Sequence, residues 1–278
     1  MIQLRYIDSE VKFVKNIDLI KIPSIEFPGG YKTIKNINKE NMEYLNKYFK
    51  CESKYHHWKE ISGAPLPGSS EYLAARASVV KRLIKAESML PEGLSLKIYD
   101  AYRPIAIQQA LWDYYREEKI KENPSLNDDE INKITSFCVS FPSYDIIKPS
   151  LHNTGGAVDL TIINKDGIEL DMGCDFDEFS PKAWTDYYEK NDIDDEVRDN
   201  RRLLYSVMIE AGFTNLPSEW WHYDYGDNAW AHITGLDPIY TGILDAIVNK
   251  REDYQNMDEI RRIDNRQQQK IHQNIEIN

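Results

Sequence analysis

The sequence predicts an α+β fold in which helices pack on a sheet. Apolar residues recur at helical spacing in three stretches, and two other stretches alternate apolar and polar residues as half-buried strands do. No internal repeat or long low-complexity linker separates these stretches. We therefore expect one main domain at residues 1–240, followed by a polar, mostly helical extension at residues 241–278.

The first predicted helix follows a loop. Residues 61–70, I-S-G-A-P-L-P-G-S-S, crowd glycine, proline and serine together, which is typical of a loop. A helix is expected from Glu71 to the P-E-G stop at 91–93. Its apolar stripe consists of Leu73, Ala77, Val80 and Ile84.

A strand and a second helix come next, with an arginine between them. Residues 94–98 alternate apolar and polar side chains, and the strand should end at D-A-Y-R-P. Pro104 is well placed as the first residue of the helix. The apolar stripe of this helix consists of Ile107, Leu111 and Tyr114. Arg103 therefore lies at a strand–helix junction, where rigid scaffolds often hold functional side chains.

The second half of the chain contains another strand and another helix. Residues 121–149 are polar and indicate loops. In the strand expected at 157–163, Val158, Leu160 and Ile162 face one way and Asp159 faces the other. Residues 191–200 are rich in Asp and Asn, and a helix is expected from Arg201 to the C-terminal stop at Gly212. Its apolar positions are Leu203, Leu204, Val207 and Met208. A short strand or turn containing E-W-W-H follows at 219–222.

Composition excludes several classes of protein. The chain has 278 residues, 41% hydrophobic and 29% charged, as in globular proteins that bury a sizeable core. Its net charge of −12 argues against nucleic acid and anionic membranes as partners, because their phosphates would repel it. Cys51, Cys138 and Cys174 form neither a CxxC spacing nor a disulfide framework, which suits a reducing compartment. The N-terminus lacks the apolar run of a signal peptide, and no segment approaches roughly 18 apolar residues. We expect a cytoplasmic protein.

Two short stretches contain the residue types of a metal site. S-L-H-N-T-G-G-A-V-D-L-T-I at 150–162 contains His152 and Asp159, and E-W-W-H contains His222. Three such ligands and one open position are what catalytic zinc requires, whereas structural zinc more often uses cysteines. Glu219 could act there as a general base only if a bend brings it to the same side as His222.

Each of these features also has an ordinary structural interpretation. A single histidine is more often hydrogen-bonded than metal-bound, and the double glycine could be a simple turn. Trp220 and Trp221 are expected to be packing residues, and Arg103 alone could be a surface ion pair. Taken separately, none of the features decides the function.

Taken together, the motifs resemble a known family. The sequence is similar to the zinc D-alanyl-D-alanine dipeptidases, the VanX-type branch (peptidase family M15) of a wider family of D-Ala-D-Ala carboxypeptidases. The main matching motifs are S-x-H-x-x-G-x-A-x-D at 150–159, E-W-W-H-Y at 219–223 and D-A-Y-R-P at 100–104. Two softer segments, 172–177 and 200–213, support them. The motifs occur in the family's order and cover most of residues 70–225.

The resemblance implies a fold and a metal site. The fold would be of the Hedgehog/D,D-peptidase type, with a mainly antiparallel sheet flanked by helices and Zn²⁺ in a cleft on the sheet. His152, Asp159 and His222 would be the zinc ligands. Residues 1–240 would then form a zinc D,D-dipeptidase domain.

The resemblance also implies roles for the surrounding residues. Glu219 would be the catalytic base and later the proton donor, and Arg103 would stabilise the tetrahedral oxyanion. Asp177 would receive the free ammonium of the substrate, and Ser150 would contact the bound dipeptide. Residues 50–65, including Y-H-H-W, are interpreted as an insertion, so His56 and His57 inherit no role.

The function expected from the sequence is zinc-dependent hydrolysis of D-alanyl-D-alanine or a similar dipeptide, within cell-wall peptide metabolism. One alternative is a D-Ala-D-Ala carboxypeptidase or a broader cell-wall peptidase, which a pocket opened by residues 50–65 would favour. Another is a non-catalytic, zinc-stabilised binding protein, against which Glu219 and Arg103 argue because structural zinc needs neither. The expected partner is a small peptide, and homo-oligomerisation is left open.

Overall fold

The computed structural model describes residues 19–24, 40–58, 66, 68–191 and 193–243. Most of the predicted loop at 61–70 and nearly all of the predicted extension at 241–278 lie outside the described residues. Within the part of the chain that is described, every helix is too short or too polar to span a bilayer.

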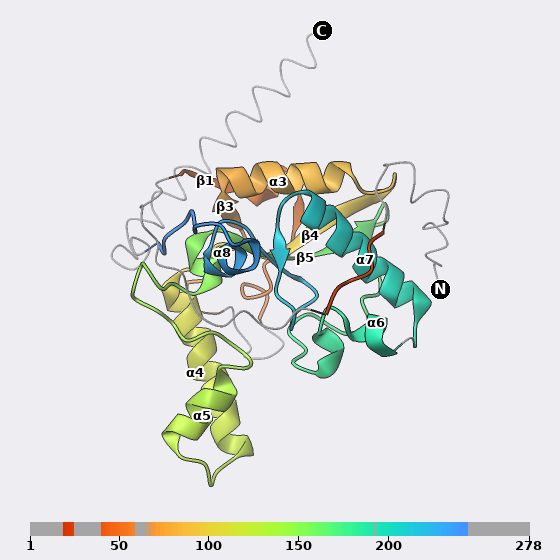
Figure 1. The fold of residues 1–278 in the computed structure, drawn as a ribbon. Coiled ribbons are helices and arrows are strands. Elements are labelled where there is room, and N and C mark those ends of the chain that lie inside the picture. The colour runs from red at the N-terminus through yellow and green to blue at the C-terminus, as the bar shows by residue number, and fades with distance from the viewer. Residues whose placement is uncertain (1–18, 25–39, 59–65, 67, 192, 244–278) are drawn as a thin grey trace.

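A five-stranded sheet forms the centre of the molecule (Figure 1). Its strand order is β2-β4-β5-β7-β6, and all neighbours are antiparallel except β2 and β4. A separate antiparallel pair consists of β1 and β3. The strands are β1 (Met42–Tyr44), β2 (Lys50–Cys51), β3 (Ala74–Arg76), β4 (Leu94–Asp100), β5 (Ala157–Asn164), β6 (Thr214–Asn215) and β7 (His222–Asp224). The predicted α+β fold with a mainly antiparallel sheet is confirmed.

Helices flank this sheet, and one pair projects from it. The α-helices are α3 (Ala77–Ser88), α4 (Ile105–Glu122), α5 (Asp128–Thr135), α6 (Tyr187–Asn191), α7 (Asp195–Glu210) and α8 (Asn228–Thr234). Short 3-10 helices are η1 (Leu45–Lys47), η2 (Leu151–Thr154) and η3 (Pro181–Ala183). Helices α3 and α7 pack against each other over the main core, whereas α4 and α5 form an arm that extends away from the sheet (Figure 1).

The core lies on one face of β5. Val158, Leu160 and Ile162 are fully buried and join residues of α3 and α7 in a single apolar cluster. Asp159 points to the opposite face, as the alternation of the sequence predicts. Trp220 and Trp221 are buried in the same cluster, which confirms that they are packing residues. One face of the sheet therefore supplies stability and leaves the other available for a site.

The first predicted helix begins later than expected. Residues 74–76 form β3 instead, because they pair with β1, and the helix starts at Ala77. Ile84, placed on the apolar stripe, is 43% exposed, whereas Val80 and Leu83 are buried. A tertiary strand pairing thus overrides the helical spacing of the first turn.

The prediction of loops at 121–149 is wrong in part, because α5 lies within this segment. Its signal was present in the sequence: Asn127 and Glu130 form a reciprocal capping box at the helix start. Helix α7 likewise begins before Arg201, because Asp194 accepts hydrogen bonds from the first-turn amides. Pro104 is the residue just before α4 rather than its first residue.

Candidate metal centre

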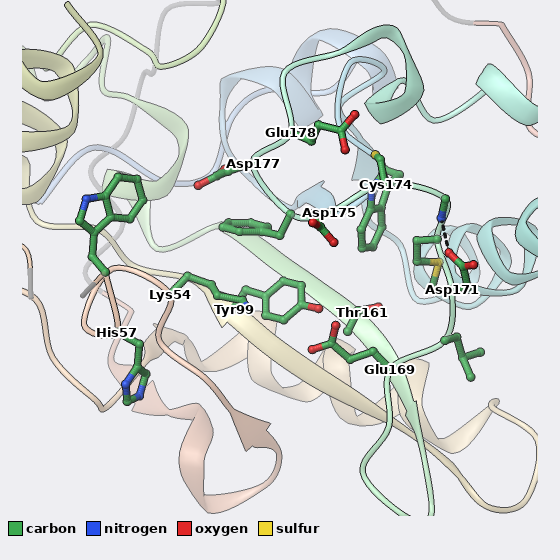
Figure 2. Close-up of a pocket in the computed structure, with 16 residues that line it drawn as sticks. Lys54, His57, Tyr99, Thr161, Glu169, Asp171, Cys174, Asp175, Asp177 and Glu178 are labelled. Carbon is green, nitrogen blue, oxygen red and sulfur yellow. Dashed lines mark hydrogen bonds between the residues drawn. The ribbon is translucent and has the colours of Figure 1, made fainter. Parts of the chain in front are cut away.

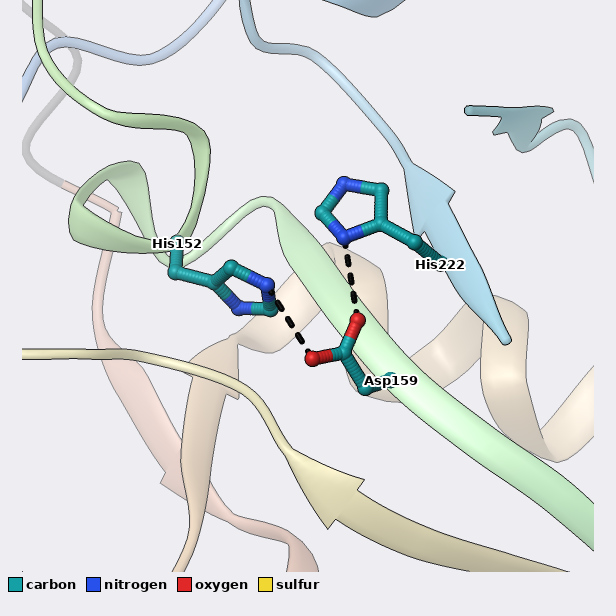
Figure 3. A group of neighbouring side chains, drawn as sticks. All are labelled: His152, Asp159 and His222. Atoms are coloured by element: carbon teal, nitrogen blue, oxygen red, sulfur yellow. Dashed lines mark hydrogen bonds and ion pairs between the residues drawn. The ribbon is translucent and has the colours of Figure 1, made fainter. Parts of the chain in front are cut away.

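Three buried side chains meet on the site face of the sheet (Figure 3). His152, Asp159 and His222 offer ligand atoms that all lie within 4.8 Å of one another. Asp159 lies between the imidazoles, with its Oδ2 3.3 Å from His152 Nε2 and its Oδ1 2.9 Å from His222 Nδ1. The register of β5 with β7 explains half of this arrangement, because it pairs Asp159 directly with His222. The structure therefore brings together the three residues predicted from two distant motifs.

The double glycine explains how His152 reaches Asp159. Helix η2 ends at Gly155, whose φ of 72° lies in the left-handed region that favours glycine. Gly156 then passes so close to Tyr225, the residue after β7, that a Cβ atom at Gly156 would lie 2.5 Å from the carbonyl oxygen of Tyr225. The chain can therefore reverse tightly after His152 and enter β5 with Asp159 facing the same cleft.

The outer nitrogen of each imidazole already has an acceptor. His152 Nδ1 lies 2.8 Å from the carbonyl oxygen of Ala101, and His222 Nε2 lies 2.8 Å from Asp224 Oδ1. When these nitrogens carry the ring protons, His152 Nε2 and His222 Nδ1 present lone pairs to the centre of the cluster. Metal-binding histidines are normally held in this way by a carbonyl or carboxylate. The donor set thus fits a metal ion.

Asp159 is ionised in this environment. Burial alone would raise the pKa of its carboxyl group, but the His152 and His222 imidazoles outweigh burial and hold that pKa below its usual range. The buried Asp159 carboxylate therefore places negative charge beside the space between the three residues. That charge favours a cation at the centre.

Glu219 reaches the same cleft through a bend. The amide of Glu219 donates to the carbonyl of Leu216, and the amide of His222 donates to the carbonyl of Glu219, which forms a turn before β7. Glu219 Oε2 consequently lies 3.8 Å from His222 Nδ1, as the bend expected from the sequence requires. Burial raises the pKa of the Glu219 carboxyl group above its ordinary value despite the adjacent His222. Such a group can accept and return a proton.

Arg103 is buried and rigidly held beside the cluster. Its Nε donates to Asp100 Oδ2 at 2.9 Å, and its Nη1 donates to Gln108 Oε1 at 2.9 Å. Its Nη2 donates to the hydroxyl of Tyr55 at 2.9 Å and lies 3.8 Å from Asp159 Oδ2. The surface ion-pair interpretation is therefore excluded, since the guanidinium is 7% exposed and faces the cleft.

Asp177 and Ser150 lie in the walls of the same small cavity, which has a volume of about 60 Å³. Asp177 has a φ of 61°, uncommon for a residue with a side chain. Burial and the neighbouring Asp159 and Glu219 carboxylates raise the pKa of Asp177 well above its usual range. Ser150 is buried, and its Oγ has no hydrogen-bond partner among the described residues. Ser150 thus presents a hydroxyl whose partner is not supplied by the described residues, whereas Asp177 accepts from the hydroxyl of Tyr55.

Most of the chain is similar to known proteins. Residues 39–240 match the peptidase M15 family model, described as D-Ala-D-Ala dipeptidase. The chain belongs to this family. A D-alanyl-D-alanine dipeptidase of Synechocystis is 30% identical over 197 residues, covering 64% of this chain and 78% of the relative. Those of Escherichia coli and Enterococcus faecium are 31% and 29% identical, covering 57% and 64% of this chain and 72% and 87% of the relatives.

Tyr55 is a site residue that the sequence did not reveal in this M15 family member. It lies within residues 50–65, which were interpreted as an insertion. The first two residues of this segment form β2 at the edge of the sheet, and the segment lies within the range that matches the family model. The Tyr55 hydroxyl accepts from Arg103 and lies 3.4 Å from Asp177 Oδ2. No local motif marks Tyr55, because its contacts depend on where distant segments fold.

A larger cleft adjoins the candidate metal centre (Figure 2). It has a volume of about 640 Å³ and shares Asp177 with the smaller cavity. Tyr99 and Thr161 contribute to it from β4 and β5, and Thr161 lies two residues beyond Asp159 on the same face. Segment 54–58 contributes Lys54, His57 and Trp58. The cleft therefore opens on the side of Asp177 that is lined by the supposed insertion.

Proposed function

We propose that the chain is a zinc-dependent D-alanyl-D-alanine dipeptidase that hydrolyses D-Ala-D-Ala or a similar dipeptide to free amino acids. The carrying observation is the buried His152, Asp159 and His222 cluster with Glu219 and Arg103 directed at it, in a member of the M15 dipeptidase family. The non-catalytic alternative is disfavoured because a purely structural metal would need neither Glu219 nor Arg103.

Zinc is the metal that the donor set favours. Two imidazoles and one carboxylate, with room for a further ligand, are typical of catalytic zinc. A bound zinc ion supplies Lewis acidity, polarising the scissile carbonyl and lowering the pKa of a water molecule to about 7. The remaining chemistry is assigned to side chains of the chain.

Glu219 is proposed as the general base and general acid. Its carboxylate takes the proton of the attacking water and passes it to the leaving amine as the peptide bond breaks. Glu219 Oε2 lies 3.8 Å from His222 Nδ1 and is not one of the three clustered residues, which supports a role beside the proposed ligands. Its raised pKa suits both halves of this proton transfer.

Arg103 is proposed to stabilise the oxyanion of the tetrahedral intermediate. Asp100, Gln108 and Tyr55 hold the guanidinium in place, so little reorganisation is needed when negative charge develops. Loss of such a donor typically reduces the rate about 100- to 1000-fold.

Asp177 and Ser150 are proposed to bind the substrate. Asp177 lies close to the Asp159 and Glu219 carboxylates, so an incoming ammonium would be attracted to this part of the pocket. The unpaired hydroxyl of Ser150 is available to a polar group of the dipeptide. A free amino end would thus be part of what the enzyme recognises.

A carboxypeptidase that acts on longer peptides is the second candidate. The cleft of about 640 Å³ beyond Asp177, lined partly by residues 54–58, favours it because a longer peptide needs room on that side. Tyr55 lines the smaller cavity, Phe176 lines the larger cleft and Asp177 lines both, and the contacts of Tyr55 with the other two residues favour the dipeptidase because they narrow the passage between the cavities.

A substrate panel with the zinc-loaded protein tests the proposal. We expect rapid cleavage of D-Ala-D-Ala and little cleavage of L-Ala-L-Ala or a stem pentapeptide. Preferential cleavage of the pentapeptide would replace the dipeptidase by the carboxypeptidase. No cleavage of any peptide, with zinc bound, would contradict both.

The domain bounds, the location and the metabolic role of the protein complete the proposal. We infer that residues 1–240 form the catalytic domain and that residues 241–278 are an extension to it. Cys51, Cys138 and Cys174 are all free thiols, which supports a reducing, cytoplasmic location. A role in cell-wall peptide metabolism follows from the proposed substrate.

A further inference from the structure

Two buried carboxyl groups lie behind the candidate metal ligand His222. Asp224 follows His222 by two positions in β7, so the two side chains lie on the same face of the strand. Asp224 Oδ1 is 2.8 Å from His222 Nε2, on the side of the ring away from Asp159. Asp224 and Asp227 both have 0% exposure. Neither carboxyl group belongs to the cluster of three candidate ligands.

Asp227 holds Asp224 from the other side. One oxygen of Asp227 caps α8 by accepting from the amide of Trp230 at 3.0 Å. Among the described residues, Asp224 Oδ2 and Asp227 Oδ2 meet no N–H or hydroxyl donor. The two carboxyl groups lie close enough to interact, and a hydrogen bond between them would require a proton on one of them because two carboxylates would repel. Burial and the adjacent Asp224 raise the pKa of Asp227 well above its usual range, which agrees with a proton on Asp227.

We propose that Asp224 is a positioning residue for the metal ligand His222, and that Asp227 fixes Asp224 by donating an acid O–H to it. This inference rests on the proposed metal site. Asp224 Oδ1 accepts the Nε2–H of His222, so the Nδ1 lone pair is directed toward Asp159 and the proposed metal. The negative charge of Asp224 also makes the imidazole a stronger donor.

Capping of α8 alone does not explain this arrangement. A cap needs one oxygen of Asp227 and no second acid. Burying the extra carboxyl of Asp224 is costly unless a charged or hydrogen-bonded partner compensates. His222 is that partner in the described structure, and a cation beyond His222 would strengthen the interaction.

Zinc affinity of the full 278-residue chain, measured by competition with a chromophoric chelator, tests the proposal. Asp224→Ala should weaken zinc binding about 10- to 100-fold, the usual effect of losing such a partner. Asp224→Asn retains an acceptor for His222 but not the charge, so it should restore part of the affinity. Asp227→Asn should leave affinity unchanged, since an amide N–H replaces the acid O–H. Asp227→Ala removes this donor and should weaken zinc binding.

A matched control separates positioning from helix capping. Asp194 caps α7 as Asp227 caps α8 but lies outside the cavity at the metal centre. Asp194→Ala should therefore reduce stability without changing zinc affinity. If the alanine variants do not fold, the two near-isosteric asparagine variants decide the question. Equal zinc affinity of Asp224→Asn and Asp227→Asn would then overturn the proposal.

His222→Ala, measured in parallel, distinguishes two kinds of failure. If His222→Ala loses zinc but folded Asp224→Ala binds as tightly as the unmodified protein, the positioning role is wrong and the metal site stands. If neither change affects zinc affinity, the metal site itself is wrong. Loss of affinity in both variants, with retention in Asp227→Asn, supports the proposal.

Discussion

At the scale of the residue, a change at Glu219 tests whether zinc binding can be separated from the chemical step. Glu219→Gln should keep zinc and the fold, because the three proposed ligands remain, but should lose most of kcat because an amide cannot accept the proton. Zinc content and rate are measured on the same preparation. Loss of zinc would make Glu219 a ligand, and an unchanged kcat would remove it from the mechanism.

Selectivity at the residue scale depends on Asp177. Acetylation of the substrate amine removes the charge that Asp177 is proposed to bind, a contact worth about 1.5–3 kcal/mol before the cost of leaving the carboxylate unpaired. N-acetyl-D-Ala-D-Ala should therefore have a kcat/KM at least about 100-fold below that of D-Ala-D-Ala.

Asp177→Asn is the control for this selectivity. It should reduce turnover of the free dipeptide far more than any residual cleavage of the acetylated form, because only the free dipeptide brings an ammonium. Equal kcat/KM for the two substrates in the unmodified enzyme would contradict the dipeptidase and promote the carboxypeptidase, without affecting the zinc site.

At the scale of the element, the turn from η2 into β5 connects two of the proposed metal ligands, His152 and Asp159. Gly156→Ala would place a Cβ atom 2.5 Å from the backbone oxygen of Tyr225, so the turn or β7 must shift. We expect a loss of about 1–3 kcal/mol in unfolding free energy, typical of overpacking, together with weaker zinc binding. Denaturant unfolding and zinc titration provide the two measurements.

Gly235→Ala is the matched change for this turn. Gly235 has a φ of 78°, and a Cβ atom there would meet nothing within 4 Å. The variant should cost stability through its backbone conformation, about 1–2 kcal/mol, but retain zinc affinity. If Gly156→Ala also retained full zinc affinity, the turn would not be what sets the separation of His152 and Asp159.

At the scale of the whole molecule, zinc should stabilise the fold. The proposed ligands come from η2, β5 and β7, so a metal bound to all three favours the folded state over the unfolded chain. Free zinc at about 100 times its Kd should add about 2.7 kcal/mol, equivalent to roughly 5–11 °C in Tm. Thermal unfolding with zinc and with chelator measures this difference.

His152→Ala is the control at this scale. It removes one of three ligands, so the zinc-dependent rise in Tm should largely disappear. An equal rise in this variant would show that zinc stabilises the protein from another position. No rise in the unmodified chain would count against the metal site.

Many residues of the candidate site could be predicted because they lie in short local motifs. Alternation in 157–163 directed Asp159 away from the core, and the need for a bend before His222 is met by the turn at Glu219. Helix starts were predicted less well. The helix expected from Glu71 begins only after β3, because the pairing of β3 with β1 competes there with the helical spacing of the sequence.

The sequence by itself determined which residue types are available for the chemistry. It also determined, through the alternation in β5, which side chains face the core and which face the site. These depend on neighbours in the chain, through strand periodicity, the glycine turn and the spacing within each motif. Only the tertiary structure decided that Tyr55 contacts both Arg103 and Asp177, and that Asp227 lies behind Asp224. Such contacts join segments whose proximity is set by the packing of the whole sheet and its loops. A local sequence pattern can therefore indicate a candidate metal ligand, whereas the groups proposed to hold it in position come together only when the chain is folded.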